Sequence, residues 1–122
     1  MKLEFLDNDS IVRLFGFDSS EAQKLKTAIE NILINHHSSL NLASLNFITP
    51  VNCSLAFIIS ESNKGITTTD KKLFTCDLNL EGYREMVNLM EPFCNKESPG
   101  YQWLYDIADT PFEFLFSPTG KW

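Results

Sequence analysis

The stretch that decides the fold class is residues 18–36, which read DSSEAQKLKTAIENILINH. Asp18 and Glu21 have the spacing of a capping box, in which an N-cap acceptor is followed three residues later by glutamate. Behind them the apolar side recurs every three or four places, at Ala22, Leu25, Ile29, Ile32, Leu33 and His36. This periodicity predicts an amphipathic helix over residues 19–36, about 27 Å long.

Segments with strand character lie on both sides of this helix. Residues 2–6 and 11–17 are rich in apolar and aromatic side chains and are joined by the turn formers of residues 7–10, so they predict a hairpin. The strands predicted after the helix are residues 45–49, 51–59, 66–78, 101–105 and 112–116.

A second helix is predicted over residues 80–91, because Asn79 can cap its start and Pro92 should end it. The resulting order is β-β-α-β-β-β-α-β-β. Runs of adjacent strands with few helices are typical of an α+β fold, here a mainly antiparallel sheet with two helices packed on one face. The 122 residues fit a single α+β domain over 1–122.

Composition narrows the classes of protein to consider. No stretch approaches the roughly 20 apolar residues of a membrane helix, and the start lacks a signal-peptide pattern, so we expect a cytoplasmic protein. The three cysteines, Cys53, Cys76 and Cys94, are odd in number and far apart. They predict free, mostly buried thiols rather than a disulfide framework.

The net charge of −6 is unevenly distributed along the chain. Residues 77–113 carry eight acidic side chains against two basic ones, whereas residues 1–76 are almost balanced. Nucleic acid and anionic membranes attract basic surfaces, so neither is expected as a partner. A basic protein partner is expected instead.

Acidic residues at the start of the second helix are the first candidate site. Glu81 and Glu85 are four residues apart and share one helix face, with Asp77 close to their line. Like charges at this spacing destabilise a helix slightly, which favours a role in attracting a cationic partner. The alternative is an ordinary solvated face, on which Asp77 and Glu81 complement the helix N-terminus.

The aromatic C-terminal region is the second candidate. Tyr101 and Trp103 lie on one predicted strand face, and Trp122 closes the chain. Trp and Tyr are the side chains that most often anchor protein interfaces. The alternative is that aromatic side chains on paired strands simply form core, which is the interpretation we favour for Phe112, Phe114 and Phe116.

Catalytic and metal-binding patterns are weak. His36 or His37 could meet a cysteine in space, but no spacing requires such a pair. Zinc motifs, calcium loops, phosphate-binding loops and serine nucleophile elbows do not occur, so no metal or cofactor is predicted. The sequence therefore favours binding over catalysis.

Three hypotheses follow. The leading one is a protein-binding module for a basic partner, comparable to an inhibitor or immunity protein, that uses Asp77, Glu81, Glu85, Tyr101, Trp103 and Trp122. The second is a small-molecule pocket between the helices and the sheet, which could also be catalytic, lined by Tyr83, Met86, Met90 and the aromatic strands. The third is a homodimer formed through an exposed sheet edge or an aromatic face, which acts as a subunit of a larger assembly.

Overall fold

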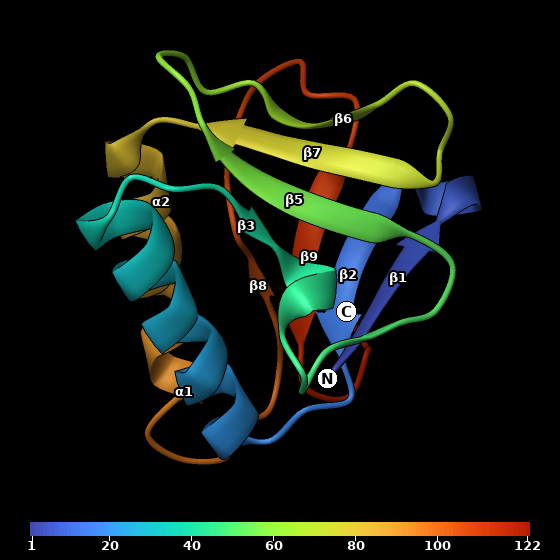
Figure 1. Ribbon diagram of the computed structural model, residues 1–122. Helices are drawn as coiled ribbons and strands as arrows, with labels where there is room; N and C mark the ends of the chain where they lie inside the picture. Colours follow the sequence, from blue (N-terminus) through green and yellow to red (C-terminus); the bar gives the residue numbers. More distant parts are fainter.

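A computed structural model describes residues 1–122 (Figure 1). The strands are β1 (Lys2–Leu6), β2 (Ile11–Phe15), β3 (Leu40–Asn41), β4 (Thr49–Pro50), β5 (Ser54–Ile59), β6 (Gly65–Thr68), β7 (Leu73–Leu78), β8 (Gln102–Trp103) and β9 (Glu113–Ser117). The helices are α1 (Ser19–Ala28), the π-helix η2 (Ile29–Asn35) and α2 (Leu80–Met90), with short 3₁₀ turns η1 (Asp7–Asp9), η3 (Leu42–Ser44) and η4 (Glu91–Phe93). The fold is α+β, as predicted.

The strands form two sheets that mix parallel and antiparallel pairs. Sheet A has the order β4-β1-β2-β9-β8, and sheet B has the order β3-β5-β7-β6. The pairs β1–β4, β2–β9 and β5–β7 are parallel, and the other four pairs are antiparallel. The prediction of a mainly antiparallel sheet is therefore wrong, and the predicted order of elements is not confirmed.

Two of the three parallel pairs, β2–β9 and β5–β7, join strands at interior positions of their sheets. In β9 the four residues from Phe114 to Ser117 are all buried, which is typical of an interior strand covered on both faces. In sheet B, β7 buries Phe74, Cys76 and Leu78, whereas β6 is more polar and takes the edge. Strands that follow each other in the sequence are therefore not always neighbours in the sheet.

Three predicted strands differ in the structure. The predicted strand over residues 101–105 is reduced to the two residues of β8. Residues 45–49 are mostly a turn after η3, and only Thr49 joins the short strand β4. Residues 66–78 form two strands, β6 and β7, joined by a tight connection. Asp70 stabilises that connection, because its carboxylate accepts hydrogen bonds from the backbone amides of Lys72 and Leu73, both at 2.9 Å.

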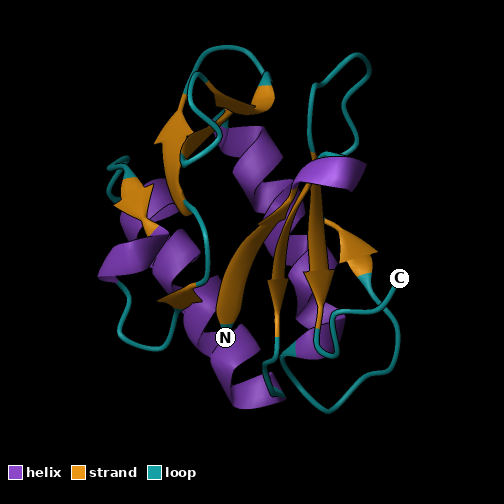
Figure 2. Ribbon diagram, turned by 90° about the vertical axis from the view of Figure 1, so that its right-hand side faces the viewer, coloured by secondary structure: helices purple, strands orange, loops and turns teal.

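The helices begin where their capping residues predict. The Asp18 carboxylate accepts from the Glu21 amide at 2.8 Å, and the Glu21 carboxylate accepts in return from the Asp18 amide at 3.4 Å. Asn79 caps α2 by accepting from the Gly82 amide at 2.8 Å. The first predicted helix changes from α to π after Ala28. Both helices lie on the same side of the strands, which stand in front of them in Figure 2.

Aromatic side chains join the two sheets. The rings of Phe5 in β1 and Phe74 in β7 lie 4.8 Å apart, and those of Phe57 in β5 and Phe114 in β9 lie 5.9 Å apart. They belong to one continuous cluster of 30 buried residues that also includes the inner sides of both helices. A cluster of this extent identifies the main core of the protein.

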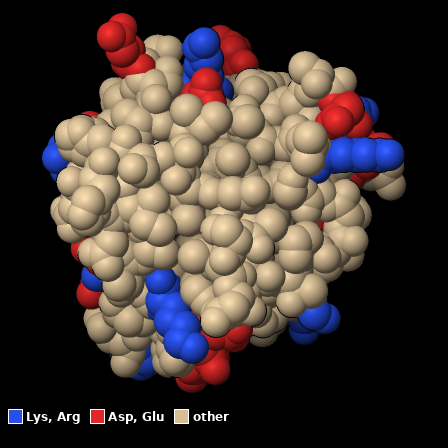
Figure 3. Space-filling model, viewed as in Figure 1, with Lys and Arg blue, Asp and Glu red and all other residues tan.

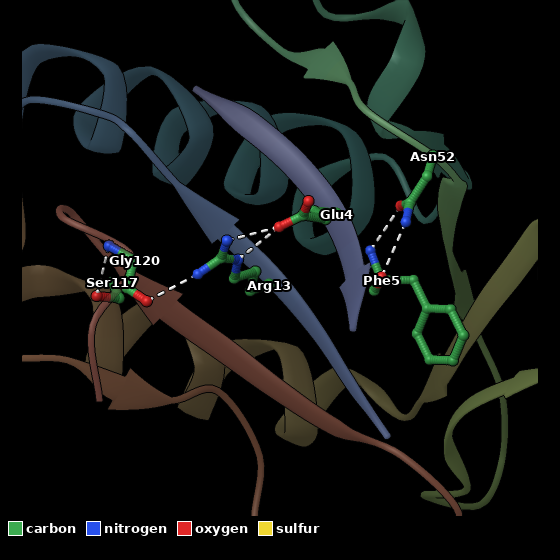
Figure 4. A network of polar contacts seen from close by, with 6 residues as sticks. All are labelled: Glu4, Phe5, Arg13, Asn52, Ser117 and Gly120. Atoms are coloured by element: carbon green, nitrogen blue, oxygen red, sulfur yellow. Dashed lines mark hydrogen bonds and ion pairs between the residues drawn. The ribbon is translucent and has the colours of Figure 1, made fainter. Parts of the chain in front are cut away.

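Polar contacts hold distant segments against sheet A (Figure 4). Arg13 in β2 donates to the Glu4 carboxylate at 2.9 and 2.6 Å and to the carbonyl of Gly120 at 2.8 Å. The Asn52 side chain accepts from the Phe5 amide at 2.8 Å and donates to the Phe5 carbonyl at 2.9 Å. Asn52 thereby continues the hydrogen bonding of the β1 edge.

Candidate functional site

The first turns of α2 form one wall of the candidate site. The Asn79 cap fixes the start of the helix, and the buried side chains Tyr83 and Met86 fix its orientation on the core. Glu81 and Glu85 consequently point to solvent, as their spacing predicts. Glu81 lies in the first turn, where the helix dipole stabilises a negative charge.

The segment from β8 to Ile107 forms the opposite wall. Tyr105 anchors it, because the Tyr105 hydroxyl accepts from the backbone amide of Ile66 at 3.0 Å and donates to the carbonyl of Phe112. Burial raises the pKa of this hydroxyl to about 12, so the phenol stays protonated across the physiological range. The next residue, Asp106, is held at the surface beside α2.

Two adjoining hollows lie between these walls. One has a volume of about 300 Å³ and the other about 560 Å³, and both are lined by Glu85, Tyr105 and Asp106. Glu81 completes the first hollow, and Trp103 and Glu113 complete the second. We call the combined depression the acidic groove, defined by Glu81, Glu85, Trp103, Tyr105, Asp106 and Glu113.

The acidic groove carries negative charge that is largely uncompensated. No lysine, arginine or histidine lines either hollow. Of its four carboxylates only Glu81 forms an ion pair, a 3.7 Å contact with Arg84 in which both side chains are exposed. Exposed ion pairs of this kind have small interaction energies. Glu85, Asp106 and Glu113 form no ion pair within the molecule.

The residues predicted from the sequence lie in three places. Glu81, Glu85 and Trp103 are brought together in the acidic groove. Tyr101 and Trp122, which are 45% and 49% exposed, line a separate hollow of about 350 Å³ that also contains Lys121. The rings of Tyr101 and Trp103 nevertheless lie only 5.9 Å apart, edge to face.

Asp77 lines none of the hollows. It occupies β7 opposite Ile58 of β5 and Gly65 of β6, half-buried between the fully buried neighbours Cys76 and Leu78. The strand alternation places its side chain on the outer side of sheet B. The helix spacing that links Glu81 with Glu85 therefore does not extend to Asp77.

Asp106 and Glu113 are groove residues that sequence reasoning did not single out. They belong to the acidic segment 77–113 but are 21 and 28 residues from Glu85 in the sequence. Their proximity depends on how β8 and β9 pair and on the Tyr105 anchor. The only signal in the sequence was the excess of acidic residues, which does not specify position.

Comparison of the chain with family models, with curated proteins and with solved structures found no match. The groove is therefore interpreted from its own residues alone. No helix combines the length and the apolar character that crossing a membrane requires. Nowhere do three or more His, Cys, Asp and Glu side chains gather as a metal site would need.

The thiols have none of the features of an activated nucleophile. All three cysteines are free and buried, as predicted. Burial raises the pKa of Cys53 to about 11 and that of Cys76 to about 12, whereas reactive cysteines have lowered values. His36 and His37 are exposed at the end of η2, and neither forms a hydrogen bond with a cysteine.

Proposed function

We propose that this chain is a protein-binding module that holds a basic protein partner in the acidic groove, in the manner of an inhibitor or immunity protein. The observation that carries the proposal is the absence of any cationic side chain from a groove that contains four carboxylates. Such a surface accelerates encounter with a basic partner and orients it. A cytoplasmic location is part of the proposal, since three free thiols suit a reducing compartment.

Trp103 gives the groove a second means of recognition. Its indole is half-buried in β8 and lines the second hollow beside Glu85 and Glu113. The planar guanidinium group of arginine stacks on tryptophan faces and donates two hydrogen bonds to one carboxylate. The ammonium group of lysine is a point charge without this planar geometry. We therefore expect arginine side chains of the partner to be preferred over lysine.

The small-molecule alternative keeps only part of its proposed lining. Trp103 and Tyr105, from the predicted aromatic strand, line the hollows, whereas the side chains expected from α2 do not. Tyr83, Met86 and Met90 are fully buried and line none of the hollows. The Tyr83 hydroxyl lies 2.6 Å from the Cys76 carbonyl and 2.9 Å from the Ile58 carbonyl, so it is occupied within the core. These side chains stabilise the fold instead.

The proposal is tested by titrating the isotope-labelled protein with an arginine-rich peptide and following amide chemical shifts at low and moderate salt. Shifts should cluster on α2, β8 and residues 104–107, and binding should weaken with salt. The double variant Glu85→Gln with Asp106→Asn should bind roughly three- to tenfold more weakly, because each exposed charge contact contributes modestly.

A matched control distinguishes the groove from net charge. The double variant Asp9→Asn with Glu61→Gln makes the same change in charge at two exposed carboxylates outside the groove. It should bind the peptide like the wild type. Equal weakening by both double variants, or shifts scattered over the molecule, would reject the acidic groove as the binding site.

A further inference from the structure

A long stretch of the chain has no formal charge. Residues 31–60 contain no Asp, Glu, Lys or Arg, so the other 92 residues carry all 26 of these side chains. At the overall proportion of 21% charged residues, about six would be expected in a stretch of this length. The stretch is also not an interior segment, because most of it reaches the surface.

This stretch forms one face of the molecule. It comprises most of η2 together with β3, η3, β4 and β5, which lie toward the viewer in Figure 1. Figure 3 shows the same face as a broad surface without charge, with acidic and basic atoms toward its margins. We call it the neutral face, defined by the surface residues of segment 31–60.

The neutral face has the size and composition of a protein interface. Of its 30 residues, 14 are exposed and nine are half-buried, which matches the roughly 20 to 30 residues that each partner contributes to a standard interface. Ten of these 23 are apolar, including Val51 at 51% exposure, and the rest are Asn, Ser, Thr and His. Depletion of charge is the compositional mark of an interface centre.

The outer side of β5 gives a second reason to expect a covering partner. Ser54, Ala56 and Ile58 point outward from a strand that pairs in parallel with β7 over six residues. Parallel strands are usually covered on both faces. Here the three outward side chains of β5 are only half-buried.

We propose that the neutral face binds a second copy of this chain in a symmetric dimer. In such a dimer the same patch meets itself, so any charged side chain near the centre faces its own copy. Two chains that each carry a net charge of −6 repel each other, and a face without charge lets them meet without opposing like charges. A basic partner has its counter-charges in the acidic groove and none on this face.

The oligomeric state in solution tests the proposal, and it does so independently of the acidic groove. Sedimentation velocity over a range of protein concentrations should show a species of twice 13.9 kDa. Ala43, exposed on η3 within the neutral face, is the site for the variants. Ala43→Asp and Ala43→Lys should each weaken the dimer about a hundredfold, because either charge would be desolvated without a partner.

The chain offers a matched control in its one other exposed alanine, Ala108, which lies outside the neutral face. Ala108→Asp and Ala108→Lys should leave the dimer unchanged. Asn46→Asp is a second test, used if circular dichroism shows that the Ala43 variants fold poorly. Asn46 is exposed on the neutral face, and aspartate has the same shape as asparagine. A wild type that stays monomeric at all concentrations, or a dimer that tolerates charge at both Ala43 and Asn46, would overturn the proposal.

Discussion

The Tyr105 side chain anchors the wall of the acidic groove that runs from β8 to Ile107. Its hydroxyl joins the β6 amide of Ile66 to the carbonyl of Phe112, and so connects the edge of sheet B to the segment that leads into β9. A buried amide left without an acceptor would cost about 1–3 kcal/mol. The buried hydrogen bonds of the Tyr105 hydroxyl therefore hold in place the segment that forms this wall of the acidic groove.

Gly65 makes room for this contact. Its φ is +76°, and a Cβ atom built there would lie 2.9 Å from Thr110 Oγ1 and 2.9 Å from Tyr105 Cζ. Gly65→Ala should lower the free energy of unfolding by about 2–4 kcal/mol, from left-handed strain plus overpacking. Urea denaturation measures the change.

Gly100→Ala is the control for backbone strain alone. Gly100 also has a positive φ, +94°, but a Cβ there would meet nothing within 4 Å. Its substitution should cost only about 1 kcal/mol. Equal losses at the two positions would show that the space beside Tyr105 does not matter.

Trp103 should report directly on occupation of the acidic groove. With Trp122→Phe as background, Trp103 is the single tryptophan, and its fluorescence should change when an arginine-rich peptide binds. Trp103→Ala should weaken peptide binding about two- to fivefold, the range of an exposed cation–π contact. In a Trp103→Phe background, Trp122 should remain unaffected, and a response from Trp122 instead would locate the peptide in the other hollow.

At the scale of elements, Arg13 ties three parts of the chain together. It pairs with Glu4 of β1, caps the Gly120 carbonyl and lies 4.0 Å from the centroid of the Phe15 ring. Arg13→Lys keeps the charge but loses the planar donor geometry. We expect a loss of about 1–2 kcal/mol in thermal or urea unfolding.

Arg84→Lys provides the comparison, because Arg84 is the only other arginine in the chain. Its ion pair with Glu81 is solvent-exposed and 3.7 Å long. The substitution should change stability by less than about 0.5 kcal/mol. A similar effect at both arginines would mean that the contacts in Figure 4 do not stabilise the fold.

Elements that are specified by neighbouring residues could be predicted from the sequence. The caps at Asp18 and Asn79 and the apolar periodicity behind each are local, and both helices begin at these caps. Strand pairing is not local, because β2 and β9 are about a hundred residues apart. The alternation of Phe112, Phe114 and Phe116 did not reveal that Leu115, between them, is also buried.

For the whole molecule, the same limit applies to the candidate site. The excess of acidic residues in segment 77–113 was visible in the sequence, and that segment includes Glu81 and Glu85, which line the acidic groove. Tertiary structure decides which other carboxylates of the segment lie near Glu81 and Glu85. Asp106 and Glu113 lie in the acidic groove, whereas Glu91 forms an ion pair with Lys26 of α1 at 3.1 Å. The spacing of acidic residues along the sequence does not indicate which carboxylates lie in the groove and which form ion pairs elsewhere.

The buried thiols should make the protein sensitive to alkali. Burial raises the pKa of Cys53 to about 11 and of Cys76 to about 12, whereas an unfolded cysteine ionises near about 8.5. Above that pH the unfolded chain loses protons that the folded chain keeps. These two thiols should therefore leave the free energy of unfolding unchanged below about pH 8.5. They should lower it as the pH rises toward about 12.

Cys76→Ala separates this effect from general alkaline unfolding. The variant should be less stable at neutral pH because of the lost side-chain volume, but its free energy of unfolding should decline less steeply between about pH 8.5 and 11. Urea melts at stepwise pH values provide the comparison. Parallel declines for the wild type and the variant would exclude Cys76 as a source of the pH dependence.

The short edge strands have a consequence for solubility. Three of the four sheet edges are β3, β4 and β8, each only two residues long, and the fourth, β6, has four. Long unpaired edges act as templates on which further chains add strand by strand into fibrils. We therefore expect the two-residue edges β3, β4 and β8 to be poor templates for growth into cross-β aggregates.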